Sequence, residues 1–77
     1  MSVRDEILVL LHHYYPVAVK VGTIRESLNR RFLPEVNDTL HVLWSEKLIE
    51  GTFTTEYKLT APGLQAALEI RKKLSID

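Results

Sequence analysis

The segment that decides the fold is residues 40–63, which read LHVLWSEKLIEGTFTTEYKLTAPG. It starts with apolar residues at helical spacing and continues with two runs of β-strand character, 48–53 and 56–60. Only Thr54 and Thr55 separate the two runs, which predicts a tight hairpin even though such turns usually contain a glycine. The segment therefore predicts a helix that leads into a β-hairpin.

The residues around this hairpin predict one helix on each side of it. Pro34 suits the first turn of the preceding helix, which we expect to end near Lys47. At about 100° per residue, the predicted buried face of that helix consists of Val36, Leu40, Leu43 and Trp44. After the hairpin, Thr60 is a suitable N-cap and Pro62 suits the first turn of a final helix. The broad apolar stripe of the final helix consists of Leu64, Ala67, Leu68, Ile70 and Leu74.

The first half of the chain predicts two further helices and a short strand. Ser2 is a suitable N-cap for a helix that Pro16 stops, because the residue before a proline avoids the α region. The alternating residues that predict the strand are Val17, Val19 and Val21. Thr23 and Glu26 then form a capping box that opens a second helix. The predicted buried side of this second helix consists of Ile24, Leu28 and Phe32.

The composition is typical of one small globular domain, and we expect it to cover residues 1–77. Of the 77 residues, 45% are hydrophobic and 26% are charged. The predicted order of helices and strands gives an α+β fold. Because there is no cysteine and no catalytic motif, we expect neither an enzyme nor a bound metal or cofactor. The sequence shows no signal peptide and no apolar run of about 20 residues, so we expect a cytoplasmic protein without membrane contact.

The net charge is zero, but the charges are distributed unevenly along the chain. Residues 19–33 contain four basic side chains and one acidic side chain, whereas residues 34–51 contain one basic and four acidic side chains. A nucleic-acid-binding domain usually has a basic excess. This sequence instead places a basic second helix directly before an acidic third helix.

Four short motifs carry a resemblance to a known family: Leu40-x-x-Leu43, Lys47-Leu48-Ile49-Glu50, Tyr57-Lys58-Leu59-Thr60 and Ala61-Pro62-Gly63. With this spacing the chain resembles the winged helix-turn-helix family, in particular MarR- and PadR-type regulators, over roughly residues 3–74. The resemblance implies a three-helix core, a short β-hairpin wing and a C-terminal helix. Members of the family often have a helix-ending glycine where this chain has Lys47.

The resemblance also implies a small, dimeric transcription regulator that binds double-stranded DNA, with the helix at about 34–47 in the major groove. The candidate phosphate contacts are Lys20, Arg25, Arg30 and the backbone amides around Thr23. The candidate base and wing contacts are Asn37, His41 and Lys58. The candidate contacts between two copies are Ile70 and Leu74.

A second interpretation makes the same fold a protein-docking module that does not bind DNA. Carboxylates near the start of the third helix suit the helix dipole but repel phosphates. The predicted partner-binding face consists of Glu35, Asp38, His41, Val42 and Ser45. In this interpretation the basic side chains of the second helix form a solvated face that the acidic third helix balances. The sequence leaves both interpretations open.

Overall fold

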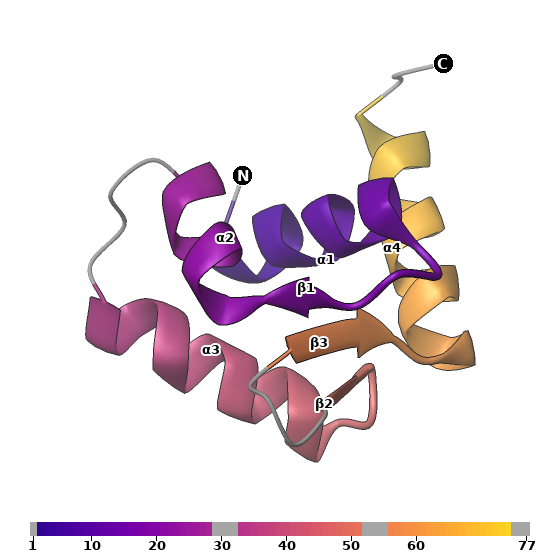
Figure 1. The fold of residues 1–77 in the computed structure, drawn as a ribbon. Helices are drawn as coiled ribbons and strands as arrows, with labels where there is room; N and C mark the ends of the chain where they lie inside the picture. The colour runs from indigo at the N-terminus through magenta and orange to yellow at the C-terminus, as the bar shows by residue number, and fades with distance from the viewer. Residues whose placement is uncertain (1, 29–32, 52–55, 75–77) are drawn as a thin grey trace.

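The computed structural model describes residues 2–28, 33–51 and 56–74. Their elements are α1 (Val3–Tyr14), β1 (Val19–Lys20), α2 (Val21–Ser27), α3 (Leu33–Ser45), β2 (Ile49–Gly51), β3 (Glu56–Leu59) and α4 (Ala61–Lys73). Figure 1 shows α4 packed against α1, while α3 lies beside the strands β2 and β3. The predicted α+β class is confirmed, and the arrangement of the helices around the small sheet is compatible with a winged helix.

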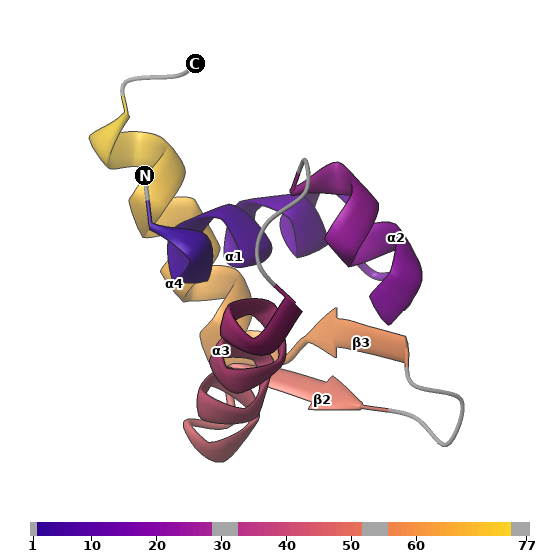
Figure 2. The ribbon, with the colours of Figure 1, turned by 90° about the vertical axis from the view of Figure 1, so that its left-hand side faces the viewer.

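The sheet has three antiparallel strands in the order β1-β3-β2. The central strand β3 pairs with β2 through Ile49 and Leu59, and with β1 through Val19 and Tyr57. The two strands of the predicted hairpin are therefore present, and Figure 2 shows them extending away from α4. The predicted tight turn falls in 52–55, outside the described residues.

All four helices contribute to one hydrophobic core, and no buried residue in the described part of the chain is polar. In α3, the buried residues Val36, Leu40 and Leu43 recur at helical spacing, as predicted. Phe32, which was also expected in the core, lies outside the described residues. The buried set is Val3, Ile7, Leu8, Leu11, Val19, Ile24, Leu28, Val36, Leu40, Leu43, Ile49, Leu59 and Ala67. Removing these aliphatic side chains from water is the main favourable contribution to folding.

Two of the helix N-caps that the sequence predicts are present. At the start of α1, the Asp5 amide donates a hydrogen bond of 3.1 Å to Ser2 Oγ. At the start of α4, the Gly63 amide donates a hydrogen bond of 3.1 Å to Thr60 Oγ1. Each side chain satisfies one of the amides that a helix start leaves without an intrahelical partner.

The start of α2 differs from the prediction. The helix begins at Val21 with Lys20 as its N-cap, so Thr23 lies inside the first turn and the predicted capping box is wrong. Strand β1 is correspondingly short, because its pairing with β3 ends at Lys20. The physical reason is that Val21, Ile24 and Leu28 have the spacing of one helical face, and all three pack into the core. This helical pattern outweighs the alternation of valines that predicted a longer strand.

Helix α3 ends in a hydrogen-bonded turn centred on Lys47. The Lys47 amide donates to the Trp44 carbonyl at 3.0 Å, and the Leu48 amide donates to the Leu43 carbonyl at 3.0 Å. These are the two bonds of a Schellman motif, in which the residue after the C-cap adopts a left-handed conformation. Lys47 has a φ of 63°, so this chain places a lysine in the conformation that favours glycine.

We expect Lys47→Gly to be more stable than Lys47→Ala by about 1 kcal/mol, because only the alanine variant keeps a Cβ in the left-handed region. Both variants remove the same charge and the same side-chain stem, so their difference isolates the backbone conformation. Chemical denaturation of the two proteins measures it. Equal free energies of unfolding would contradict the left-handed conformation at this position.

Gly63 marks a close approach between α4 and the chain segment that follows α3. The residue is buried, and an added Cβ would overlap the carbonyl oxygen of Leu48. That carbonyl also accepts a hydrogen bond of 3.1 Å from the Thr60 amide, so it cannot move away without breaking a second contact. Gly22 provides a contrast, since no atom lies within 4 Å of a Cβ added there.

Gly63→Ala should therefore lower the free energy of unfolding by more than about 2 kcal/mol, the range typical of overpacking at a buried site. Gly22→Ala is the matched control, because it adds the same methyl group to a helix in open space. It should leave stability unchanged or raise it by up to about 1 kcal/mol. Thermal unfolding of both variants tests the pair, and a similar stability for the two would refute the close approach at Gly63.

Candidate interaction site on helix α3

Helix α3 presents two exposed faces that differ in chemistry. Asn37, His41 and Trp44 follow one another at helical spacing and line a hollow between α3 and β3. Residues Glu35, Asp38 and Val42 form a second series at helical spacing, and all three are exposed. We call the first series the hollow face and the second series the acidic face. The predicted docking residue His41 lies on the hollow face, so the structure divides the set proposed for a protein partner.

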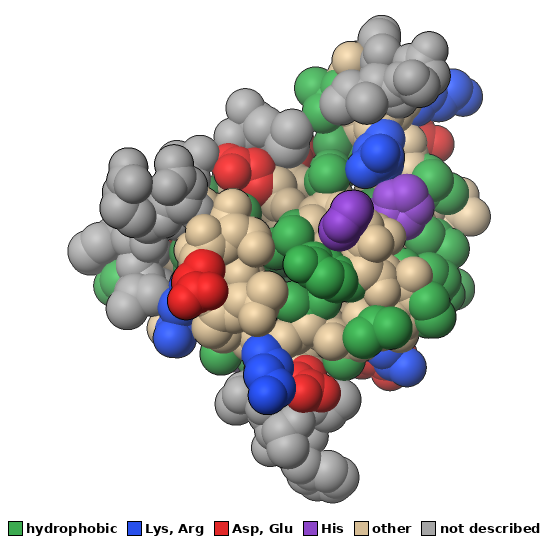
Figure 3. Space-filling view, turned by 45° about the horizontal axis from the view of Figure 1, so that its top comes forward, with side chains coloured by type: hydrophobic (Ala, Val, Ile, Leu, Met, Phe, Trp, Pro, Cys, Tyr) green, Lys and Arg blue, Asp and Glu red, His purple; other side chains and the backbone are tan. Residues whose placement is uncertain are grey.

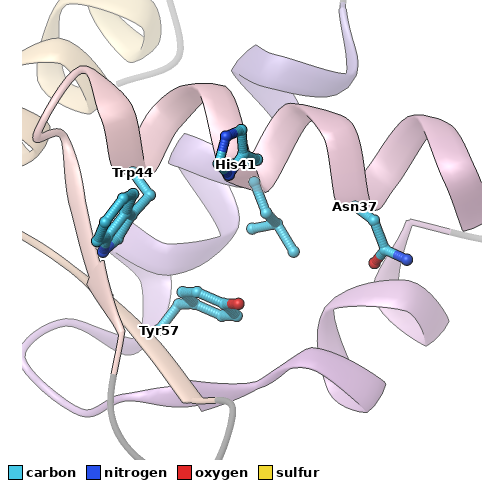
Figure 4. A pocket seen from close by; sticks show the side chains of 5 residues that line it. Asn37, His41, Trp44 and Tyr57 are labelled. Atoms are coloured by element: carbon cyan, nitrogen blue, oxygen red, sulfur yellow. The ribbon is translucent and has the colours of Figure 1, made fainter.

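The hollow has a volume of about 320 Å³ and is lined by aromatic, aliphatic and amide side chains. Figure 4 shows Trp44 and Tyr57 towards one end of it and Asn37 at the other. Leu40, which is only 3% exposed, completes the lining from α3. Tyr57 is contributed by β3, so the site requires both the helix and the hairpin.

Trp44 does not belong to the core, contrary to the prediction. Its side chain is 55% exposed, and its ring stacks with that of His41 at a centroid distance of 6.3 Å and an angle of 24°. Helical spacing placed Trp44 at the edge of the buried face, next to Leu40 and Leu43. Because the hairpin leaves a hollow beside this edge instead of covering it, the indole remains accessible to solvent.

Two predicted contact residues from different helices meet at the polar end of the hollow. Nη2 of Arg25, from α2, donates a hydrogen bond of 3.3 Å to Oδ1 of Asn37. Nε of Arg25 is buried and has no hydrogen-bond partner among the described residues. Since the amide of Asn37 is neutral, this contact orients the guanidinium without neutralising its charge. The sequence suggested each residue separately but gave no signal that they touch.

Two further predicted cations, Lys58 and Lys20, lie on the sheet. Lys58 Nζ is 3.9 Å from Glu50 Oε2 on the neighbouring strand, and both side chains are exposed. Exposed pairs of this kind contribute less than about 1 kcal/mol, so Lys58 can exchange its partner at little cost. Lys20 is exposed and lies opposite Glu56 in the register of β1 and β3. Arg30 lies outside the described residues.

The acidic face combines carboxylates with an exposed aliphatic side chain. Val42 is 47% exposed, in helical register with Glu35 and Asp38. Near the end of the helix, Glu46 accepts a hydrogen bond of 3.1 Å from Arg4 of α1, which ties this end of α3 to the first helix. On the face of the molecule in Figure 3, the basic side chains of the described residues are scattered singly.

The two candidate dimer residues differ in how much of them is available to a second copy. Ile70 is partly buried and packs against the core of its own chain. Leu74, the C-cap of α4, is 41% exposed. Both line a second hollow, between α1 and α4. Leu74 is therefore the more accessible of the two for an intermolecular contact.

No protein-family model, curated protein or solved structure shows a significant match to this chain. None of the helices in the described ranges is long and apolar enough to cross a membrane. In the same part of the chain, no group of three His, Asp or Glu side chains is placed to hold a metal ion.

Exchange of Trp44 for alanine should cost far less stability than exchange of its neighbour Leu43. Leu43 is fully buried, and truncation of such a residue costs about 2–5 kcal/mol. Trp44 is mostly exposed, so its truncation should cost about 1 kcal/mol or less. Urea denaturation of Leu43→Ala and Trp44→Ala measures both values. A loss at Trp44 as large as that at Leu43 would contradict an exposed indole.

Proposed function

We propose that this chain is a DNA-binding winged-helix protein, a small transcription regulator that places α3 in the major groove of double-stranded DNA. The observation that carries the proposal is the contact between Arg25 and Asn37 beside His41. It places a guanidinium for which the described residues provide no carboxylate partner next to two exposed side chains that can form hydrogen bonds with base edges. Phosphate contacts position a protein on DNA and base contacts give it specificity, so both kinds of contact are needed in one interface.

The dimensions of α3 fit this role. Thirteen residues at about 1.5 Å per residue give a helix of roughly 20 Å, and a major groove about 12 Å wide admits an α-helix. Asn37 and His41 are one turn apart on the hollow face, so both can contact base edges from the same side of the helix. Strand β2 packs against α3 and pairs with β3, and the proposal assigns Lys58 of β3 to the flanking DNA backbone.

Each cation has a separate role in the proposed complex. Arg25 contacts a phosphate while its hydrogen bond to Asn37 orients the amide towards the bases. Lys58 exchanges its weak pair with Glu50 for a phosphate. Lys20 and Arg30 are assigned to further phosphates along the DNA backbone.

Several broader properties belong to the same proposal. A homodimer that forms through Leu74 and Ile70 would set two copies of α3 about one turn of DNA apart. The protein acts by binding and not as an enzyme. Its proposed location is the cytoplasm, because the DNA of a cell without a nucleus lies there.

The acidic face supports a second candidate function, the binding of a protein partner. An exposed Val42 in register with two carboxylates suits a basic surface that has an apolar contact at its centre. DNA is repelled by the same face. In this alternative, the exchange Val42→Asp abolishes docking of the protein partner. Exchanges of the hollow-face residues leave docking unchanged.

The salt dependence of DNA binding tests the first proposal. Fluorescence anisotropy with a mixed-sequence duplex gives the slope of log affinity against log salt, which is about −0.9 for each phosphate neutralised. The double variant Arg25→Ala, Lys58→Ala should weaken binding to all sequences and flatten the slope by nearly two for each bound protomer.

The matched control is Lys72→Ala, Lys73→Ala, which removes the same charge from exposed positions at the end of α4. It should change the slope much less. Equal effects of the two double variants would contradict the assignment of Arg25 and Lys58. Absence of duplex binding at low salt would overturn the proposal and favour the protein partner.

A further inference from the structure

We infer that the hollow between α3 and β3 holds the ring of an unstacked DNA base, so that the protein prefers DNA with an unpaired segment over the same sequence fully paired. The inference rests on the proposed DNA binding and adds the chemical group that the site takes. The occupant is an uncharged, planar ring that carries hydrogen-bond acceptors.

The lining of the hollow matches a planar ring. Trp44 is 55% exposed and is stacked with His41, and Tyr57 supplies a second aromatic surface from β3. Leu40 adds an aliphatic surface. Aromatic side chains beside cations form the usual platform on which proteins stack unpaired bases. Among the described residues that line the hollow there is no carboxylate, lysine or arginine, so the site suits an uncharged ring.

The polar end of the hollow selects for acceptor atoms. Oδ1 of Asn37 already accepts a hydrogen bond from Arg25, which leaves the amino group of Asn37 to donate. Arg25 is not among the lining residues, and its contribution to the hollow is to hold the amide of Asn37 in this orientation. A base presents carbonyl oxygens and ring nitrogens at its edge, and these match donors that lie at one end of an aromatic site.

The position of Tyr57 is built into the hairpin. Gly51 is the residue opposite Tyr57 in the pairing of β2 with β3, and a Cβ added at Gly51 would lie 3.2 Å from Tyr57 Cε1. The tyrosine ring therefore lies over a residue that has no side chain. A larger residue at Gly51 would displace the ring and change the hollow without removing any aromatic group.

The hollow can hold a base only in the unstacked state, because its lining presents ring surfaces. Within an intact duplex both faces of each base are covered by its neighbours, and only the edges are accessible. The hollow offers ring surfaces of Trp44 and Tyr57, which a base can use only after it leaves the stack. Unstacking is least costly for a base that is already unpaired. Binding should therefore be tighter to a duplex that contains a mismatched bubble.

The test compares three DNA molecules of one sequence: a duplex, the same duplex with a short central thymine bubble, and the single strand. Trp44 is the only tryptophan of the chain, so quenching of its fluorescence reports occupation of the hollow directly. We expect quenching by the bubble and the single strand, and an affinity at least about tenfold higher for the bubble than for the duplex.

Two variants locate the preference. Trp44→Leu keeps an apolar side chain at an exposed position and should lower the affinity for the bubble far more than the affinity for the duplex, so that the preference for the bubble is lost. Gly51→Val should reduce the preference through Tyr57. The control Val42→Ala, on the acidic face, should leave it intact. Thermal unfolding of each variant verifies that it is folded.

The outcomes separate this inference from the proposed function. Duplex binding with no preference for the bubble and no quenching would overturn the inference and leave the proposed function standing. Absence of binding to all three DNA molecules at low salt would overturn both. Quenching by free thymidine monophosphate without any preference among the DNA molecules would also overturn the inference, because the hollow would then take a free nucleotide.

Discussion

The carbonyl groups of Lys47 and Leu48 connect three elements of this fold. The turn that ends α3 places both of them, because the Leu48 amide is bonded to the Leu43 carbonyl. The hydroxyl and the amide of Thr60 then donate to these two carbonyls, at 2.6 and 3.1 Å. Gly63 packs against the second of them in the first turn of α4. These contacts fix three parts of the fold relative to one another: the end of α3, the start of β2 and the start of α4.

This junction also explains why a hollow exists beside α3. Near the junction the helix and the hairpin are in contact, and Leu43, Ile49 and Leu59 are all buried there. From that point α3 runs back towards Asn37 while β2 runs on towards Gly51. Figure 4 shows the two elements running apart, and Tyr57 only partly fills the space between them. A site of this form follows from the angle at which the hairpin leaves the helix.

Periodicity and capping chemistry were sufficient to predict most of the elements, because both are local. Ser2 and Thr60 cap helices as expected, and Val36, Leu40 and Leu43 form the buried face of α3. The exposure of Trp44 could not be predicted, since periodicity gives the direction of a side chain but not how far the neighbouring element covers it. The contact between Arg25 and Asn37 depends on how α2 and α3 pack, which no local pattern encodes.

The uneven charges of α3 restrict how the helix could lie in the proposed complex. Phosphates border both sides of a major groove, so a helix inserted symmetrically would bring Glu35 and Asp38 close to one of them. A rotation about the helix axis that turns the hollow face towards the DNA moves these carboxylates outward and brings Arg25 inward. The same rotation directs Trp44 and Tyr57 at the bases. Repulsion between the acidic face and the phosphates then disfavours orientations that turn this face towards the DNA. A chain with no net charge can therefore still be oriented on DNA, by repulsion on one side and attraction on the other.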